Sequence, residues 1–198
     1  MSIKQIFTTP IYEAEWSGDP STISTLKKLV LNKNLNFPYN NSKEIVEFTN
    51  WIIEHSKNFA YQVGKNKGYI GLKDMWYRTM SNSNSYVPPH THPSVWCIGT
   101  FYFEDGQGDL VLIDPRGSHD WEYGTVKDNE GYNHGNCTDY YYTPKKNTFI
   151  MFPAYIKHLV LPAHEGRTRT AISWNLLFET EGTLLKMLNP PEHLYTEL

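Results

Sequence analysis

The stretch from Thr168 to Phe178 alternates strictly between two kinds of side chain, as an extended strand with two different faces does. One face is apolar and must be buried against a core, whereas the other carries small polar groups and an arginine. Such a polar face suits a jelly-roll strand that lines a ligand cavity. The first face comprises Thr170, Ile172, Trp174 and Leu176, and the second comprises Arg169, Ala171, Ser173 and Asn175.

Seven runs before this stretch have the same β-rich texture, with Val, Ile, Tyr, Phe and Trp between clusters of Gly, Pro, Asn and Asp. About eight such strands suit a double-sheet jelly roll. The sequence therefore predicts a mainly β protein with flanking α, namely a double-stranded β-helix (jelly roll, cupin-like). The predicted strands are Leu72–Met80, Tyr86–His90, Val95–Phe103, Asp109–Asp114, Tyr140–Thr143, Thr148–Phe152, His158–Pro162 and Thr168–Phe178.

Two helices are predicted ahead of these strands, and we expect them to pack outside the sheet. Asp19 is a good N-cap and Pro20 suits the first helical position, so the first helix runs to about Leu31. Asn41 can cap the second helix, with Glu44 three residues later as in a capping box, and Gly64 is a natural C-terminal stop. Each helix carries an apolar stripe at helical spacing, which is typical of a helix that packs on a core.

The change of texture near Tyr69 divides the chain into three parts within one compact domain. Residues 1–68 supply an N-terminal strand and the two helices, and residues 69–180 form the double-stranded β-helix core. Residues 181–198 form a C-terminal tail. We expect this tail to hold a short helix near Leu184–Leu188 and an extended end that docks on the domain or on a second copy in a homodimer.

The composition narrows the class of protein. The 198-residue chain has 15% aromatic residues and a formal net charge of −3 without a basic stripe, which argues against disorder and against a dedicated nucleic-acid surface. Two cysteines, Cys97 and Cys137, cannot form a disulfide framework, which favours a reducing compartment. No segment has the length of a membrane span or the apolar run of a signal peptide, so we expect a soluble cytoplasmic protein.

The segment Pro89-His90-Thr91-His92-Pro93 is the first candidate for metal binding. Histidines at positions i and i+2 share a face of an extended segment, and imidazole is the commonest protein metal ligand. His158 lies near the start of another strand, and a jelly roll would bring the three imidazoles together at its mouth. Three imidazoles leave coordination positions open, which favours a catalytic divalent metal over a closed structural site. The alternative is a pair of ordinary surface or core histidines.

Arg169 lies eleven residues after His158 and faces inward if the strand alternation holds. A buried guanidinium needs an anion, and its planar shape suits a carboxylate bound through two hydrogen bonds. The sequence therefore offers either a site for a carboxylate ligand or an internal salt bridge to an Asp or Glu.

In order and spacing, these residues resemble the iron(II)- and 2-oxoglutarate-dependent oxygenases, and within them an uncharacterised 2OG-Fe(II) oxygenase family of bacteria and phages. The resemblance covers about Trp76 to Phe178, which is the barrel. It implies an Fe(II) centre, 2-oxoglutarate as cosubstrate and O₂ as oxidant. The matching residues are Trp76, Pro89–Pro93, Thr100–Phe103, Gly108–Arg116, Phe152-Pro153 with His158, and Arg169–Asn175.

The resemblance also implies roles for single residues. His90 is similar to the proximal iron ligand and His158 to the distal one. Arg169 is similar to the residue that binds the far carboxylate of 2-oxoglutarate, and Arg167 is the second candidate because this spacing varies among relatives. For Tyr102, a hydroxyl that donates to the same carboxylate and an ordinary aromatic on a strand are equal alternatives. A further candidate for cosubstrate binding is Ser173.

The third ligand position departs from the wider superfamily, which has H-x-D where this chain has His92 as the last residue. The usual facial triad is two histidines and one carboxylate. A site of three histidines suits Fe(II) but carries one negative charge fewer, which should alter how oxidised iron is stabilised. Asp114 is a weaker candidate for the missing carboxylate, because with Arg116 it is better explained as a turn with an internal ion pair.

The reaction implied by the resemblance is the oxidative decarboxylation of 2-oxoglutarate to succinate and carbon dioxide. This step is coupled to hydroxylation of a primary substrate that the sequence does not identify. The loop from Arg116 to Asp139 has little periodicity and is a candidate for substrate contact or a lid. It also holds His119, His134 and Cys137, whose irregular spacing matches no zinc pattern, so we expect no second metal site there.

Two other interpretations stay open on the sequence. The first is a cupin-type metal enzyme that does not use 2-oxoglutarate, although the glutamate expected a few residues after His92 is absent and Arg169 would lack a purpose. The second is a jelly-roll binding module without catalysis. Binding of 2-oxoglutarate to the metal-loaded protein would distinguish the first interpretation, and metal affinity would distinguish the second.

Overall fold

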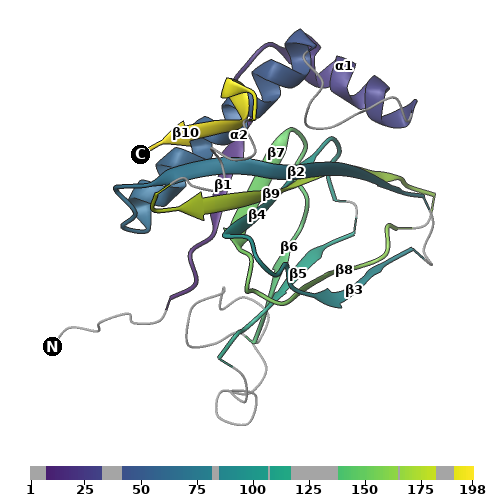
Figure 1. Cartoon of the computed structure of the whole chain (residues 1–198). Coiled ribbons are helices and arrows are strands. Elements are labelled where there is room, and N and C mark those ends of the chain that lie inside the picture. Colours follow the sequence, from purple (N-terminus) through teal and green to yellow (C-terminus); the bar gives the residue numbers. More distant parts are fainter. Residues whose placement is uncertain are drawn as a thin grey trace, which may run out of the picture.

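A computed structural model describes the chain over residues 8–32, 42–81, 85–106, 108–116, 138–164, 166–181 and 190–198. Two curled antiparallel sheets face each other, and two helices cover the outer face of the larger sheet (Figure 1). This arrangement is the double-stranded β-helix with external helices that the sequence predicts.

The larger sheet has six strands and the smaller sheet has four, and all neighbouring strands are antiparallel. The order in the larger sheet is β1 (Tyr12–Glu15), β7 (Thr148–Pro153), β4 (Cys97–Tyr102), β9 (Arg169–Glu179), β2 (Tyr69–Met80) and β10 (Tyr195–Glu197). The order in the smaller sheet is β3 (Val87–His90), β8 (His158–Val160), β5 (Leu110–Ile113) and β6 (Asp139–Tyr142).

All eight strands predicted between Leu72 and Phe178 are present. The N-terminal strand is β1, which pairs with β7. The extended end of the tail is β10, which follows a short 3₁₀ turn (η1, Glu192–Leu194) and pairs with β2 of the same chain. The helix expected near Leu184–Leu188 lies outside the described residues.

The two helices begin and end largely where their capping residues predict. They are α1 (Pro20–Leu31) and α2 (Lys43–Gln62). Oδ1 of Asp19 accepts a hydrogen bond from the backbone N of Ser21 at 2.8 Å, as an N-cap should. The N-cap of α2 is Ser42, so this helix starts slightly later than predicted; Asn41 lies outside the described residues. Gly64 follows α2 with a φ of +80°, the left-handed conformation that ends many helices.

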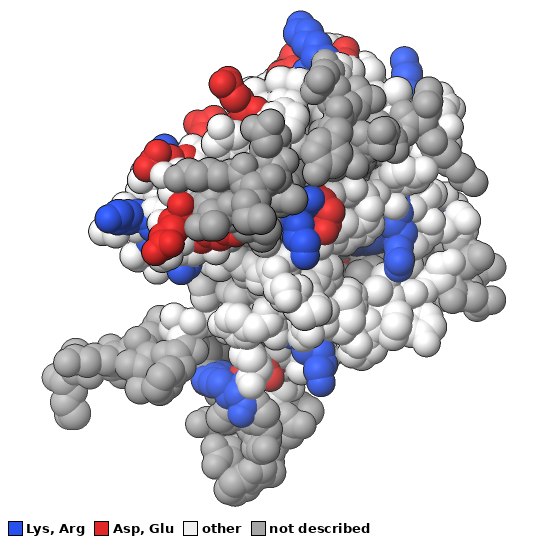
Figure 2. Space-filling model, viewed as in Figure 1, with Lys and Arg blue, Asp and Glu red and all other residues white. Residues whose placement is uncertain are grey.

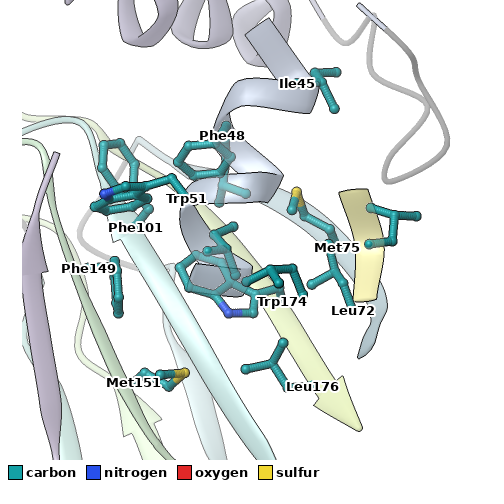
Figure 3. Close-up of a cluster of buried hydrophobic side chains, with 14 of the residues drawn as sticks. Ile45, Phe48, Trp51, Leu72, Met75, Phe101, Phe149, Met151, Trp174 and Leu176 are labelled. Atoms are coloured by element: carbon teal, nitrogen blue, oxygen red, sulfur yellow. The ribbon is translucent and has the colours of Figure 1, made fainter. Parts of the chain in front are cut away.

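The outer face of the larger sheet packs on α2 through a cluster of aromatic rings (Figure 3). Phe48 and Trp51 of α2 contact Phe101, Phe149 and Trp174 of the sheet, with ring centroids 4.9–6.3 Å apart. Such pairs add about 0.5–1.5 kcal/mol each to the stabilisation from burial. A second apolar cluster lies between the two sheets and includes Ile98, Tyr102, Leu110, Phe152 and Val160.

Gly99 of β4 makes room for Trp174 in the outer cluster. A Cβ atom at Gly99 would lie 2.3 Å from two carbon atoms of the indole ring, far closer than real contacts. The indole can therefore lie over β4 only because this residue has no side chain.

A β-bulge interrupts the pairing of β2 with β9. Leu72 is opposite Leu176, but Asp74 is opposite Asn175, so Lys73 is an extra residue on β2. A bulge of this kind shifts the alternation of the strand by one residue and re-aims the side chains that follow it.

The bulge decides which side chains of β2 reach the space between the sheets. Leu72 packs on the helix side before the bulge, and Met75 and Tyr77 do so after it. The side chains on the opposite face, between the sheets, are those of Asp74, Trp76, Arg78 and Met80.

Cys97, the described helices and the surface charges can be compared with the expectations from composition. Cys97 is fully buried, and burial raises the pKa of its thiol, so it is a protonated core residue. None of the described helices is long and apolar enough to cross a membrane. On the face shown in Figure 2, acidic and basic side chains are interspersed over the upper left of the molecule.

Candidate metal and cosubstrate site

His90, His92 and His158 come together between the two sheets. His90 ends β3 and His158 begins β8, and the two are cross-strand partners. His92 lies in the turn after β3, where its backbone N donates a hydrogen bond to the carbonyl of Ala154 at 3.1 Å. The three ring centroids are 4.2–5.3 Å apart. One nitrogen from each ring lies within 4.8 Å of the other two, a geometry that can hold one metal ion.

Hydrogen bonds to the backbone fix the tautomer of two of these rings. Nδ1 of His90 lies 2.8 Å from the carbonyl oxygen of Pro88, and Nδ1 of His158 lies 2.9 Å from that of Ile156. A carbonyl oxygen only accepts, so each Nδ1 carries the proton and donates it. The lone pair on each Nε2 is therefore available to a metal.

His92 is held by side chains instead. Its Nδ1 donates to Oδ1 of Asn175 at 2.7 Å, and Nδ2 of Asn175 donates to Oδ1 of Asp74 at 2.6 Å. A carboxylate only accepts, so Asn175 turns its amino group toward Asp74 and its carbonyl toward His92. Trp76 stacks on the His92 ring with centroids 5.8 Å apart. These contacts leave Nε2 of His92 available as well.

Burial keeps two of the histidines neutral. Removal from solvent, helped by the neighbouring His90 and His92 and opposed by the hydrogen bond to Ile156, lowers the pKa of His158 to about 4. Burial also lowers the pKa of His92, partly offset by its hydrogen bond to Asn175. Neutral imidazole is the form that binds metals, so both rings are ready to bind at neutral pH.

A cavity of about 530 Å³, including its open mouth, contains the three histidines. Among the described residues no Asp or Glu lines it, and two arginines do. Its apolar wall is formed by Val87, Ile98, Leu110, Phe152 and Val160.

Arg169 begins β9 and lines this cavity, with only 4% of its surface exposed. Its Nη1 faces the sulfur of Met80, a weak acceptor, at 3.7 Å, and its Nε has no hydrogen-bond partner in the described part of the chain. Its Cζ lies 5.1 Å from the ring centroid of Tyr102. No described Asp or Glu pairs with it, so the alternative of an internal salt bridge finds no support in the described residues. A buried guanidinium with an unused N–H can donate hydrogen bonds to a bound anion.

The other predicted cosubstrate residues differ in placement. Tyr102 is buried beside Arg169, and its hydroxyl has no described hydrogen-bond partner. Burial raises the pKa of Tyr102, so the phenol stays protonated and can donate. Oγ of Ser173 lies 3.0 Å from Oγ1 of Thr100, and both residues line the cavity. Arg167 is exposed and does not line it.

Asp114 is not part of the histidine cluster. The backbone N of Arg116 donates to its Oδ1 at 2.9 Å, and Nε of Arg116 donates to the same oxygen at 3.0 Å. This is the turn with an internal ion pair that the sequence favours. Most of the loop predicted between Arg116 and Asp139 lies outside the described residues, including His119, His134 and Cys137.

Residues 74–175, just over half of the chain, match a sequence model of the family described as "Putative 2OG-Fe(II) oxygenase". The chain belongs to this 2OG-Fe(II) oxygenase family. The protein is therefore an Fe(II)- and 2-oxoglutarate-dependent oxygenase, and O₂ is implied by the reaction. No curated protein sequence matches the chain.

Solved structures with the same fold have low sequence identity to this oxygenase. A prolyl-4-hydroxylase from Pseudomonas putida is 12% identical, with a TM-score of 0.59 and coverage of 87% of this chain and 88% of that one. HygX from Streptomyces hygroscopicus, solved with nickel and 2-oxoglutarate bound, is 8% identical, with a TM-score of 0.57 and coverage of 85% and 83%.

A 2OG-Fe(II) oxygenase family oxidoreductase from Burkholderia pseudomallei is 14% identical, with a TM-score of 0.50. The match covers 69% of this chain and 57% of that one, so this chain spans little more than half of its length. At these identities the likeness shows the shared fold.

Three residues near the site, Asp74, Arg78 and Thr100, carry no role in the predictions from sequence. The facing of Asp74 and Arg78 depends on the bulge at Lys73, which no local composition marks. Thr100 could have been found from strand alternation, because it lies two residues before Tyr102 on the inward face of β4.

Proposed function

We propose that this cavity is the active site and that His90, His92 and His158 bind Fe(II) through their Nε2 atoms. The observation that carries the proposal is the convergence of three rings whose Nδ1 atoms are all occupied. Neutral imidazoles are ordinary ligands for iron, so the donor set fits the metal. When bound, iron with 2-oxoglutarate and O₂ supplies the oxidative decarboxylation that yields succinate and carbon dioxide and hydroxylates the primary substrate.

Arg169 binds the far carboxylate of 2-oxoglutarate in this proposal. Its Nε has no partner among the described residues, and its side chain lines a cavity with an apolar wall, where a charge-assisted hydrogen bond is stronger than in water. The unpartnered hydroxyl of Tyr102 donates to the same carboxylate, and Ser173 offers a further hydroxyl on the cavity wall. The apolar wall also excludes water from the reacting groups.

The matched variants Arg169→Gln and Arg167→Gln test this assignment. We expect Arg169→Gln to weaken binding of 2-oxoglutarate to the Mn(II)-loaded protein by about 100-fold, because two charge-assisted hydrogen bonds are lost. Arg167→Gln should bind like the wild type, because its side chain is exposed and outside the cavity. Isothermal titration calorimetry measures both. The reverse result would make Arg167 the carboxylate anchor.

The same titrations distinguish the other two interpretations. Failure of 2-oxoglutarate to bind the metal-loaded wild type, or to perturb the visible spectrum of its Co(II) form, would favour a cupin-type enzyme that does not use this cosubstrate. A folded protein with no affinity for Fe(II), Mn(II) or Co(II) would favour a jelly-roll binding module.

A further inference from the structure

The cavity contains a second guanidinium that neither the iron nor the 2-oxoglutarate requires. Arg78 lies on β2, on the same face as Trp76, and lines the cavity together with Arg169. It is exposed, and no described residue forms an ion pair or a hydrogen bond with its side chain. Because β10 pairs only with residues 69–71, no described strand pairs with the edge of the larger sheet beside Arg78.

The charges of the loaded cavity leave an excess of positive charge. Ferrous iron brings two positive charges, Arg169 brings a third, and 2-oxoglutarate removes two. A carboxylate in the facial triad would cancel the remainder, but the third ligand here is the neutral His92. Arg78 then adds a further positive charge. The carboxylate of Asp74, which is hydrogen-bonded to Asn175 behind His92, offsets only part of the excess.

We propose that Arg78 binds a carboxylate or phosphate group carried by the primary substrate at the mouth of the cavity. A guanidinium at the edge of a low-dielectric cavity attracts an anion and can hold it through two parallel hydrogen bonds. Trp76, stacked on His92, provides an apolar surface beside it. The proposal rests on the proposed function, because the excess charge includes the iron and the cosubstrate.

Titration of small anions into the protein loaded with Mn(II) and 2-oxoglutarate tests the proposal. The probes are acetate and inorganic phosphate, with acetamide as the neutral match to acetate, at concentrations that do not displace the cosubstrate. We expect the anions to bind and acetamide not to bind. Arg78→Gln should weaken anion binding by at least about tenfold, the loss of one charge-assisted contact. The control Arg167→Gln, an exposed arginine outside the cavity, should leave binding unchanged.

The outcomes separate this proposal from the assignment of Arg169. Equal anion binding by wild type and Arg78→Gln, equal binding of acetamide, or no anion binding at all would overturn the role of Arg78. A loss of 2-oxoglutarate affinity in Arg78→Gln would also overturn it, because Arg78 would then be a cosubstrate ligand. If wild-type protein with Mn(II) fails to bind 2-oxoglutarate, the proposed function itself fails. Preference for phosphate over acetate, or the reverse, identifies the anionic group.

A separate observation concerns how His92 is oriented. The Nδ1 atoms of His90 and His158 bind backbone carbonyls two residues earlier in the chain, whereas that of His92 binds the side chain of Asn175. Asn175 is in turn bonded to Asp74, its cross-strand neighbour. A negative charge thus stands two hydrogen bonds behind the histidine that replaces the usual carboxylate ligand.

We infer that Asp74 and Asn175 are positioning residues that fix the ring of His92 and raise the basicity of its Nε2. Partners of this kind behind a metal ligand commonly change metal affinity by about 10- to 100-fold. The three-histidine site lacks the negative charge of the usual carboxylate ligand. The Asp74 carboxylate, two hydrogen bonds behind His92, supplies part of that charge. Because the bulge at Lys73 brings Asp74 opposite Asn175, the strand geometry supports this pairing.

An exchange of the two side chains tests this inference. Asp74→Ala and Asn175→Ala should each weaken Co(II) binding by about 10- to 100-fold and change the visible spectrum of the Co(II) form. The double variant Asp74→Asn with Asn175→Asp should restore much of the affinity, because the new Asp accepts directly from His92 while the new Asn donates to it. The inference is wrong if the single variants bind Co(II) as the wild type does, or if the exchange binds no better than they do. A merely structural pair would lower the thermal stability of the metal-free protein and leave the Co(II) spectrum of the folded fraction unchanged.

Discussion

The side chains on the two faces of β9 differ in whether the rest of the chain satisfies their contacts. On the outer face, Ile172, Trp174 and Leu176 are fully buried against α2 and the neighbouring strands, so this chain supplies all their apolar contacts. On the inner face, Arg169 is almost as deeply buried, but its Nε has no hydrogen-bond partner within the described ranges. The indole N–H of Trp174 on the outer face also has no partner among the described residues, but this face of β9 holds no charge. One alternating strand can therefore stabilise the fold with the side chains of one face and leave those of the other face for ligands.

This comparison predicts that changes on the outer face cost folding free energy and that changes on the inner face cost ligand binding. The expected loss in the free energy of unfolding is largest for the buried outer-face rings and smallest for Arg169.

Trp174→Ala should lower the free energy of unfolding by about 3–5 kcal/mol, because it removes a large, fully buried ring and leaves a cavity under α2. Urea unfolding followed by circular dichroism measures the change. Tyr155→Ala, an exposed aromatic, is the control and should change stability by less than about 0.5 kcal/mol. If the folded fraction of Trp174→Ala no longer binds 2-oxoglutarate, the outer face is needed for ligand binding as well as for stability.

Acid should destabilise the metal-free protein through His158. The folded pKa of about 4 lies below the ordinary value of 6.5, so the unfolded chain binds the proton more tightly. The contribution of His158 is complete above pH about 6.5 and is lost as pH falls toward about 4, for a total of about 3 kcal/mol. Urea unfolding across this range measures the slope. His158→Gln should flatten it, and an unchanged slope would place the titration elsewhere.

Gly99→Ala should lower the free energy of unfolding by about 1–3 kcal/mol, because the added methyl group would overlap the Trp174 ring unless the ring moves. Thermal unfolding measures the loss. The double variant Gly99→Ala with Trp174→Leu offers a check, because the smaller side chain should accept the methyl group. If the double variant loses the sum of the two single effects, the clash is not the cause.

Arg169→Met should change stability least, by no more than about 1 kcal/mol and in either direction, because it replaces a buried charge without an anion by an apolar side chain of similar length. The same variant should lose 2-oxoglutarate binding. Paired urea unfolding and calorimetry measure the two quantities. A large loss of stability would show that Arg169 belongs with the structural face of β9 after all.

The sequence predicts the strands and the facing of β9 well because alternation is a local property. The hydrophobic residues of one face occur at every second position, and no distant contact is needed to assign them. The convergence of His90, His92 and His158 also follows from sequence, because the fold class brings the strands that carry them together. Their roles as iron ligands stay a prediction.

What the sequence does not predict depends on pairing between distant strands. The choice between a buried Arg169 and an exposed Arg167 depends on where β9 begins, which the sequence locates only to within a residue or two. The contact of Asp74 with Asn175 requires the register of β2 against β9, and these residues are far apart in the chain. The position of the bulge reflects that register rather than the residue type at Lys73.

The extra residue in β2 makes the length of this strand as informative as its composition. Replacing the exposed Lys73 should be tolerated, whereas deleting it would restore an unbroken alternation and force one half of the strand to turn over. Either Leu72 would leave its place under the helices, or Trp76 and Arg78 would rotate out of the cavity into an apolar layer that cannot solvate a charge. A one-codon deletion here would therefore disable catalysis and folding together, whereas most substitutions would affect one or the other.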